Sequence, residues 1–221
     1  MSVAHAQFGG PGAVGAVVAG IVGGVGAGKS AAARAMANAL PPGECVIADS
    51  DAHVREVLAQ PEVVEQLRAW WGGGVLNDAG VVDRAKVAQV VFADEAARKR
   101  LEGLIHPRVH ALRGALFAQA RARGARLLII DAPLLFEAGV DRECDRVVFV
   151  DAPREQRLAR VIAKRGWTEA DLTRREAAQV PLEEKRRRCS DVLINDSDEA
   201  ALSERAARMV HGWLARATHA Q

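Results

Sequence analysis

Five short apolar runs lie along the chain, separated by longer stretches in which apolar positions recur with a helical period. The runs cover Val17 to Val22, Cys45 to Ala48, Leu127 to Ile130, Val147 to Val150 and Val192 to Ile194. Each is bounded by Asp, Asn, Gly or Pro, as strands commonly are. Continuous rather than alternating apolarity predicts a parallel sheet flanked by helices. We therefore predict a doubly wound α/β fold that binds ligands at the carboxyl ends of its strands.

The segment between the second and third runs spans about 80 residues, far more than one crossover connection needs. Its apolar period predicts helices over residues 53–58, 62–70, 84–92, 94–104 and 107–123. We interpret residues from about 58 to 123 as a helical insertion that covers a substrate.

A phosphate-binding motif follows the first run. Residues 23–30 read GGVGAGKS and fit G-x-x-x-x-G-K-[ST], the P-loop, whose glycines let successive backbone N–H groups face an anion. Lysine and serine at its end reach the phosphates and Mg²⁺, and a helix predicted over residues 31–40 presents its positive end to the same phosphates. The predicted ATP-binding residues here are Gly24, Val25, Gly26, Ala27, Gly28, Lys29, Ser30 and Ala31.

Two arginine-dense helical stretches, over residues 154–166 and 168–188, follow the fourth run. Solvated helix faces explain most of these charges. A P-loop phosphotransferase also needs mobile cations that close over the transferring group, so we predict a lid over residues from about 160 to 188. Arg165 and residues 173–175 are its candidate cations. A last amphipathic helix over residues 198–216 is expected to begin at Ser197 or Asp198.

Carboxylates recur where the predicted strands end. Asp49 and Asp51 follow the second run, and Asp131 follows the third. One of the first two can accept a proton from an acceptor hydroxyl while the other orients it or binds an arginine; in an extended segment both would face one side. Asp131 is placed to hold Mg²⁺ as a Walker-B-like carboxylate does. Asp often caps helices, and for Asp151 capping is the preferred interpretation.

Composition narrows the setting. A net charge of +2, from 30 basic and 28 acidic residues, does not suggest a nucleic-acid binder, whereas a pI of about 8.6 suits an anionic small substrate. Three scattered cysteines without a C-x-x-C pair fit a reducing compartment and no structural metal site. We read residues 1–14 as a disordered leader and expect a cytoplasmic protein without a membrane span.

The choice among P-loop proteins rests on the rest of the chain. A guanine-reading N-K-x-D motif is absent from the sequence, and so is a D-x-x-G switch between strands. The arginine-rich lid, helical insertion and compact size favour a kinase with a small acceptor.

Several motifs, in order, resemble those of the dephospho-CoA kinases, which phosphorylate the ribose 3′-hydroxyl of dephospho-CoA with ATP to give coenzyme A. The resemblance runs from about Val17 to about Ala215 and covers nearly the whole chain. Beyond the P-loop, the residues that carry it are Ile47 to Asp51 with Arg55, the His106-Pro107 element, Asp131 to Glu137 (DAPLLFE), Gln179 to Lys185 (QVPLEEK) with Arg175 upstream, and Asp191 to Asn195.

This resemblance implies ATP and Mg²⁺ as cofactors and dephospho-CoA as the partner substrate. It implies that Lys29, Asp51 and Arg165 are catalytic, with Asp51 as the base, and that Ser30 and Asp131 serve the metal. It implies that dephospho-CoA is bound by Asp49, Asp51, Arg55, His106 and Pro133. It also implies that Arg175 and Asn195 bind ATP together with the P-loop residues. Two positions depart from the family pattern, Val22 and Ala31, where threonine is usual.

The predicted organisation is therefore one P-loop kinase domain over residues 15–217, acting as a monomer. Two alternatives stay open from the sequence. Another acceptor, such as a nucleoside or nucleotide, would fit the same loop, and so would an ATP-sensing module without chemistry.

Overall fold

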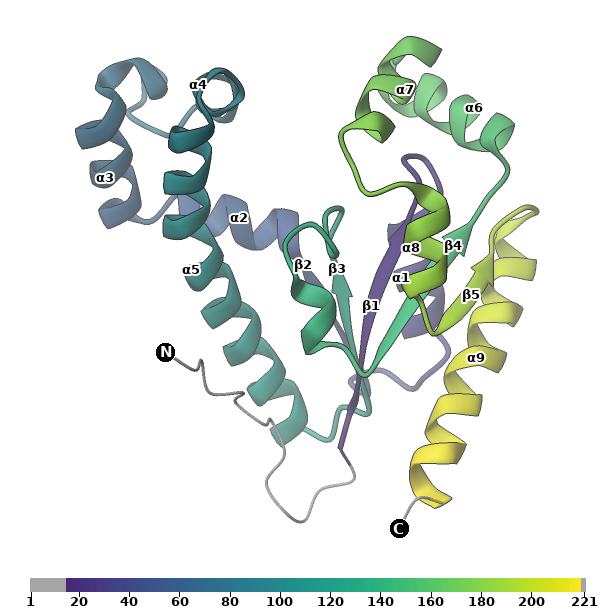
Figure 1. Ribbon diagram of the computed structural model, residues 1–221. Coiled ribbons are helices and arrows are strands. Elements are labelled where there is room, and N and C mark those ends of the chain that lie inside the picture. The colour runs from purple at the N-terminus through teal and green to yellow at the C-terminus, as the bar shows by residue number, and fades with distance from the viewer. Residues whose placement is uncertain (1–14, 220–221) are drawn as a thin grey trace. The chain divides into compact units, whose positions relative to one another are not determined.

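The structure is a computed structural model that describes residues 15–219; the predicted leader lies outside them. Five strands form one sheet in the order β2-β3-β1-β4-β5 (Figure 1). β1 pairs in parallel with β3 and β4, and β4 pairs in parallel with β5. The strands are β1 (Val17–Gly23), β2 (Cys45–Asp49), β3 (Leu127–Asp131), β4 (Arg146–Asp151) and β5 (Asp191–Ile194). All five predicted strands are confirmed, each longer by one residue at one end or both.

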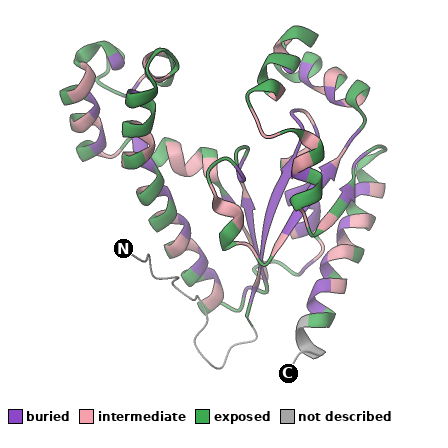
Figure 2. Ribbon diagram, viewed as in Figure 1, coloured by how far each residue is buried: buried purple, intermediate pink, exposed green. Residues whose placement is uncertain are grey.

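Five helices within residues 15–219 belong with this sheet. They are α1 (Lys29–Ala37), α6 (Arg154–Arg165), α7 (Glu169–Ala177), α8 (Leu182–Arg188) and α9 (Glu199–His219), with a short 3₁₀ turn, η2 (Val140–Glu143). β1, β3 and β4 are buried over most of their length (Figure 2). Met36 of α1 and Trp213 of α9 pack in one apolar cluster with Ile129 of β3, which anchors both helices to the sheet.

Two details of the predicted helices change. The stretch predicted as one helix over residues 168–188 is two, α7 and α8. Pro181 lacks the N–H that a continuous helix would need, and it takes the N-cap position directly before α8. Of the two candidate caps for α9, Asp198 accepts a hydrogen bond from the Ala201 N–H at 2.8 Å.

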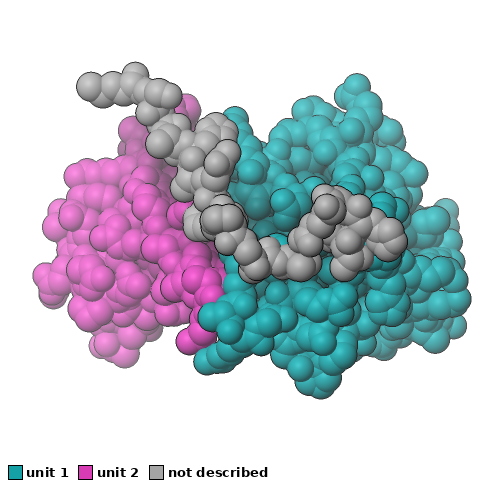
Figure 3. Space-filling model, turned by 90° about the horizontal axis from the view of Figure 1, so that it is seen from below, with its two compact units in different colours: residues 1–47, 120–221 teal, residues 48–119 magenta. Residues whose placement is uncertain are grey.

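The chain divides into two compact units, coloured in Figure 3. Residues 48–119 form one unit, and the other contains the P-loop, helices α6 to α9 and nearly all of the sheet. The smaller unit contains α2 (Ser50–Leu58), α3 (Pro61–Trp71), η1 (Gly73–Val75), α4 (Arg84–Ala93) and most of α5 (Glu95–Ala122). It has its own apolar cluster, in which Val57, Val63 and Leu67 are fully buried.

α5 corrects the prediction of two helices separated at Pro107. It is continuous over Glu95–Ala122 with Pro107 inside it. Proline removes one backbone hydrogen bond and favours a break. Here Ile105 and Val109, on either side of the proline, are both buried in the smaller unit's cluster, and this packing holds the two halves in one helix. Across residues 15–219, no helix combines the length and apolarity that a membrane span needs.

Candidate phosphate-binding site

The P-loop motif is the connection between β1 and α1. β1 ends at Gly23, and α1 begins at Lys29 directly after Gly28, which takes a left-handed conformation with φ 90°. Gly26 also has positive φ, 79°. Glycine adopts such angles without steric penalty, so this backbone can curl before the helix as the sequence predicts.

Lys29 is held at the mouth of this loop. Its Nζ donates hydrogen bonds to the carbonyl oxygens of Gly23 at 3.2 Å and Gly24 at 3.1 Å. Burial lowers the pKa of Lys29 from 10.5 to about 8; the Asp131 carboxylate opposes this shift, while Lys185, Arg165 and Arg157 add to it. The several cations around one amine leave the local charge positive, which favours an anionic ligand.

Ser30 and Asp131 come together as the sequence predicts. Ser30 Oγ donates a hydrogen bond to Asp131 Oδ2 at 2.7 Å. Asp131 ends β3 opposite Ile21 of β1, so the parallel register carries its carboxylate to the strand edge where the P-loop begins. The described residues contain no group of three His, Cys, Asp or Glu side chains able to hold a metal alone. Two oxygen donors of this kind suit a hard cation that completes its shell with water and phosphate.

Asn195 reaches the outer side of the same loop. It follows β5, is buried, and its Nδ2 donates to the Ala27 carbonyl at 2.7 Å. Arg160 Nη1 also reaches Ala27 O, at 3.4 Å, and Arg157 Nη1 reaches Val25 O at 3.4 Å. The two arginines of α6 were missed from the sequence, where they are indistinguishable from solvated charges.

Two of the predicted lid cations meet at one aromatic ring, whereas Arg174 forms an ion pair with Asp171. The guanidinium carbons of Arg165 and Arg175 lie 4.6 and 4.1 Å from the Trp167 ring centroid, within cation–π range. Gly166 ends α6 with φ 65°, and Thr168 starts α7 with a capping box to Asp171. The two predicted arginine-dense stretches thus meet at Trp167, at the junction of α6 and α7.

A buried lysine on α8 was not among the predicted site residues. Lys185 is 1% exposed; its Nζ lies 3.0 Å from Glu137 Oε1 and donates to Gln179 Oε1 at 2.9 Å. Burial by itself would raise the pKa of Glu137, but a hydrogen bond from the Val180 N–H, together with Lys185, lowers it below 4.5. Pro133, predicted on the acceptor side, is exposed in the turn after β3.

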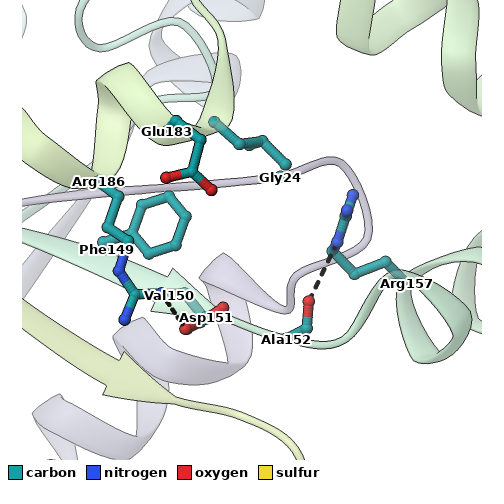
Figure 4. A pocket seen from close by; sticks show the side chains of 9 residues that line it. Gly24, Phe149, Val150, Asp151, Ala152, Arg157, Glu183 and Arg186 are labelled. Atoms are coloured by element: carbon teal, nitrogen blue, oxygen red, sulfur yellow. Dashed lines mark hydrogen bonds and ion pairs between the residues drawn. The ribbon is translucent and has the colours of Figure 1, made fainter.

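Asp151 contradicts its predicted role as a helix cap. α6 begins after Pro153 without a side-chain cap, and Asp151 instead forms an ion pair with Arg186 of α8. Both residues line a small cavity of about 100 Å³ together with Gly24, Phe149 and Arg157 (Figure 4). The cap interpretation fails because the partner of Asp151 lies 35 residues later in the chain.

The remaining predicted acceptor residues lie in the smaller unit. Asp49 caps α2 by accepting the Ala52 N–H at 3.0 Å, and Arg55 Nη2 lies 4.0 Å from its Oδ2. Asp51 is exposed in the first turn of α2, and His106 is exposed on α5. The expectation that Asp49 and Asp51 share one side of an extended segment is wrong, because the chain turns into α2 at Ser50.

The parallel five-stranded sheet and the P-loop between β1 and α1 place the protein among the P-loop nucleotide-binding proteins. A sequence profile of the dephospho-CoA kinase family matches residues 17–201. The chain belongs to the dephospho-CoA kinase family.

Curated relatives named dephospho-CoA kinase include one from Deinococcus radiodurans, 44% identical over 183 residues, or 83% of this chain and 86% of the relative. Another, from Mesorhizobium japonicum, is 42% identical over 193 residues, or 85% of this chain and 92% of the relative. A crystal structure from Thermus thermophilus matches at TM-score 0.76 and 33% identity, over 90% of this chain and 98% of that one. A Campylobacter jejuni dephospho-CoA kinase, 19% identical, shares the fold at TM-score 0.65 over 89% and 96% of the two chains.

Proposed function

We propose that this protein transfers the γ-phosphoryl group of ATP to the ribose 3′-hydroxyl of dephospho-CoA, giving coenzyme A. The observation that carries the proposal is the hydrogen bond between Ser30 and Asp131 beside Lys29, which supports a phosphate and metal site in a chain of this family.

The loop side would stabilise the phosphoryl oxygens. The backbone N–H groups of residues 24–31 and the Lys29 ammonium group would bind them, and the start of α1 adds its positive end. Mg²⁺, held by Ser30 Oγ and Asp131, would neutralise charge on the β- and γ-phosphates. Arg165 and Arg175 would leave Trp167 and close over the transferring group, while Asn195 would hold the loop beneath the nucleotide.

Asp51 is the proposed base that accepts the proton of the 3′-hydroxyl. Its neighbour Asp49 already caps α2 and lies beside Arg55. In the described part of the chain, the exposed Asp51 carboxylate makes no hydrogen bond or ion pair, so its oxygens are available to a substrate. We assign Arg55, His106 and Pro133 to dephospho-CoA binding.

The test is ADP release by the purified protein with Mg²⁺ and ATP, with and without dephospho-CoA. Mass spectrometry should find one added phosphate on the acceptor. Lys29→Ala should lower turnover by about 10²- to 10³-fold, because it removes a charge-stabilising donor. Native turnover in that variant, or ATP bound without product from dephospho-CoA, would refute the proposal.

A second comparison tests the base. Asp51→Asn should lower kcat strongly and leave ATP affinity unchanged, whereas Asp78→Asn, at an exposed aspartate of the same unit, should alter neither. Equal losses of turnover and ATP affinity in Asp51→Asn would show that Asp51 has a structural role and is not the base.

We also propose a cytoplasmic monomer that binds no nucleic acid. The three cysteines are scattered along the sequence without a C-x-x-C pair, which supports a reducing compartment. The sedimentation coefficient of the purified chain would test the monomeric state. Binding to DNA at low salt would contradict the proposed absence of nucleic-acid binding.

A further inference from the structure

The backbone carbonyls of the P-loop are held from outside by side chains. A P-loop binds phosphate through its N–H groups, so the orientation of each peptide unit decides how many N–H groups face the ligand. Val25 O accepts from Arg157, and Ala27 O accepts from Asn195 and Arg160. Arg157 and Arg160 lie one turn apart on α6. These side chains oppose rotation of the peptide units that carry the N–H groups.

Arg157 also packs closely against two glycines of the loop. A Cβ at Gly24 would lie 2.7 Å from Arg157 Nη1, and one at Gly26 would lie 2.5 Å from the Arg157 carbonyl oxygen. Neither glycine is at a fixed position of G-x-x-x-x-G-K-[ST]. Gly24 lacks positive φ, so its backbone does not require glycine. A side chain at position 24 would have to displace the Arg157 guanidinium.

The same guanidinium joins the loop to α7. Arg157 Nη1 forms an ion pair with Glu176 Oε1. Arg157 Nε donates a hydrogen bond to Ala152 O at 3.2 Å (Figure 4). The two side chains of the pair are 7% and 20% exposed, so salt screens them little. A second pair, Arg154 with Glu169, joins the same two helices but is 47% and 60% exposed.

We propose that Arg157 is a positioning residue for ATP. It keeps the P-loop N–H groups directed at the phosphates, and its ion pair with Glu176 makes this orientation depend on α7. Arg157 acts through Val25 O and does not touch the reacting atoms. The proposal needs only that the P-loop binds ATP, so it stands or falls separately from the choice of acceptor.

The test measures the ATP dissociation constant by calorimetry without any acceptor. Arg157→Gln should weaken binding about ten- to a hundredfold, as loss of a buried charge-assisted hydrogen bond does, and Glu176→Gln by a smaller factor. Arg157→Lys, which retains the charge, should recover part of the loss. Arg154→Gln, the matched control on the same helix, should change binding by less than about twofold.

Steady-state kinetics separate positioning from general structural damage. In Arg157→Gln the KM for ATP should rise while the KM for dephospho-CoA stays unchanged; a fraction of unfolded enzyme would lower kcat alone. The double variant Arg157→Gln/Glu176→Gln should bind ATP no more weakly than Arg157→Gln, because both changes break one link.

Two outcomes overturn the proposal: ATP binding by folded Arg157→Gln within about twofold of the native protein, or equal losses in Arg157→Gln and Arg154→Gln. If Arg157→Gln does not fold, Gly24→Ala decides instead, because its methyl group must displace the Arg157 guanidinium. Gly24→Ala should then weaken ATP binding, and native affinity in that variant would overturn the proposal.

Discussion

Lys29 is expected to titrate in the range of ordinary assay buffers. Burial, reinforced by three nearby cations and opposed by Asp131, lowers its pKa to about 8 in the protein without ligand. About nine tenths of the molecules then carry charge at Lys29 at pH 7, and about one tenth at pH 9. The second pKa of a phosphate group is about 6, so the ligand scarcely titrates across this interval.

ATP affinity should therefore fall as pH rises. If only the charged lysine binds phosphate, the dissociation constant increases roughly tenfold between pH 7 and pH 9. ATP binding should also raise the pKa of Lys29, because an anion favours the charged amine. Near pH 8, binding should then take up about half a proton per site.

Calorimetry between about pH 6.5 and 9.5, in buffers of different ionisation enthalpy, measures both quantities. Lys29→Arg is the matched control, because a guanidinium stays charged throughout this range. Its affinity should be nearly independent of pH. Equal native affinity at pH 7 and pH 9, or the same slope in Lys29→Arg, would refute the reasoning.

Variants of the charged residues around Lys29 should shift the pH at which ATP affinity falls. Asp131→Asn removes the neighbour that raises the pKa of Lys29, so the midpoint should move to lower pH in buffers without divalent cations. Arg165→Gln removes a cation that lowers it, so the midpoint should move to higher pH. Shifts in the opposite directions would show that other groups control the titration.

Three further variants test the packing. Lys185→Met leaves Glu137 without the ion-pair partner 3.0 Å away and should lower the free energy of unfolding in urea by about 3 kcal/mol; a change near zero would contradict this. Asp49→Ala removes the α2 cap and should cost about 1 kcal/mol, against less than about 0.5 for exposed Asp78→Ala. Pro107→Ala restores an N–H inside α5 and should raise the free energy of unfolding by about 1–2 kcal/mol; lower stability would mean that the proline is needed there.

Much of the site could be predicted because its signals are local. The P-loop motif contains the glycines of the curl and the lysine that starts α1 within eight consecutive positions. Asp131 could be placed because it directly follows the apolar run that predicts β3. Parallel strands have their carboxyl ends at one edge of the sheet, which is also where the P-loop follows β1. The pairing of Ser30 with Asp131 followed from these two facts.

Other parts of the site depend on partners far away in the chain. Arg157, Arg160 and Lys185 stand in charge-rich helices, where sequence gives no reason to separate them from solvated residues. Arg157 and Arg160 contact P-loop carbonyl groups 132 and 133 positions earlier in the chain, and Lys185 contacts Glu137, 48 positions earlier. Asp151 was misjudged for the same reason, since capping is a local interaction and its ion pair with Arg186 is not.

By itself, the sequence determined the strands, the phosphate loop and the family, because apolar period, glycine spacing and ordered motifs are properties of neighbouring residues. Only the tertiary structure decided that α5 runs through Pro107 and that Arg157 joins the P-loop to Glu176. These features depend on burial. Packing around Ile105 and Val109 outweighs the lost hydrogen bond at the proline, and low exposure makes one arginine among many a link between the P-loop and α7.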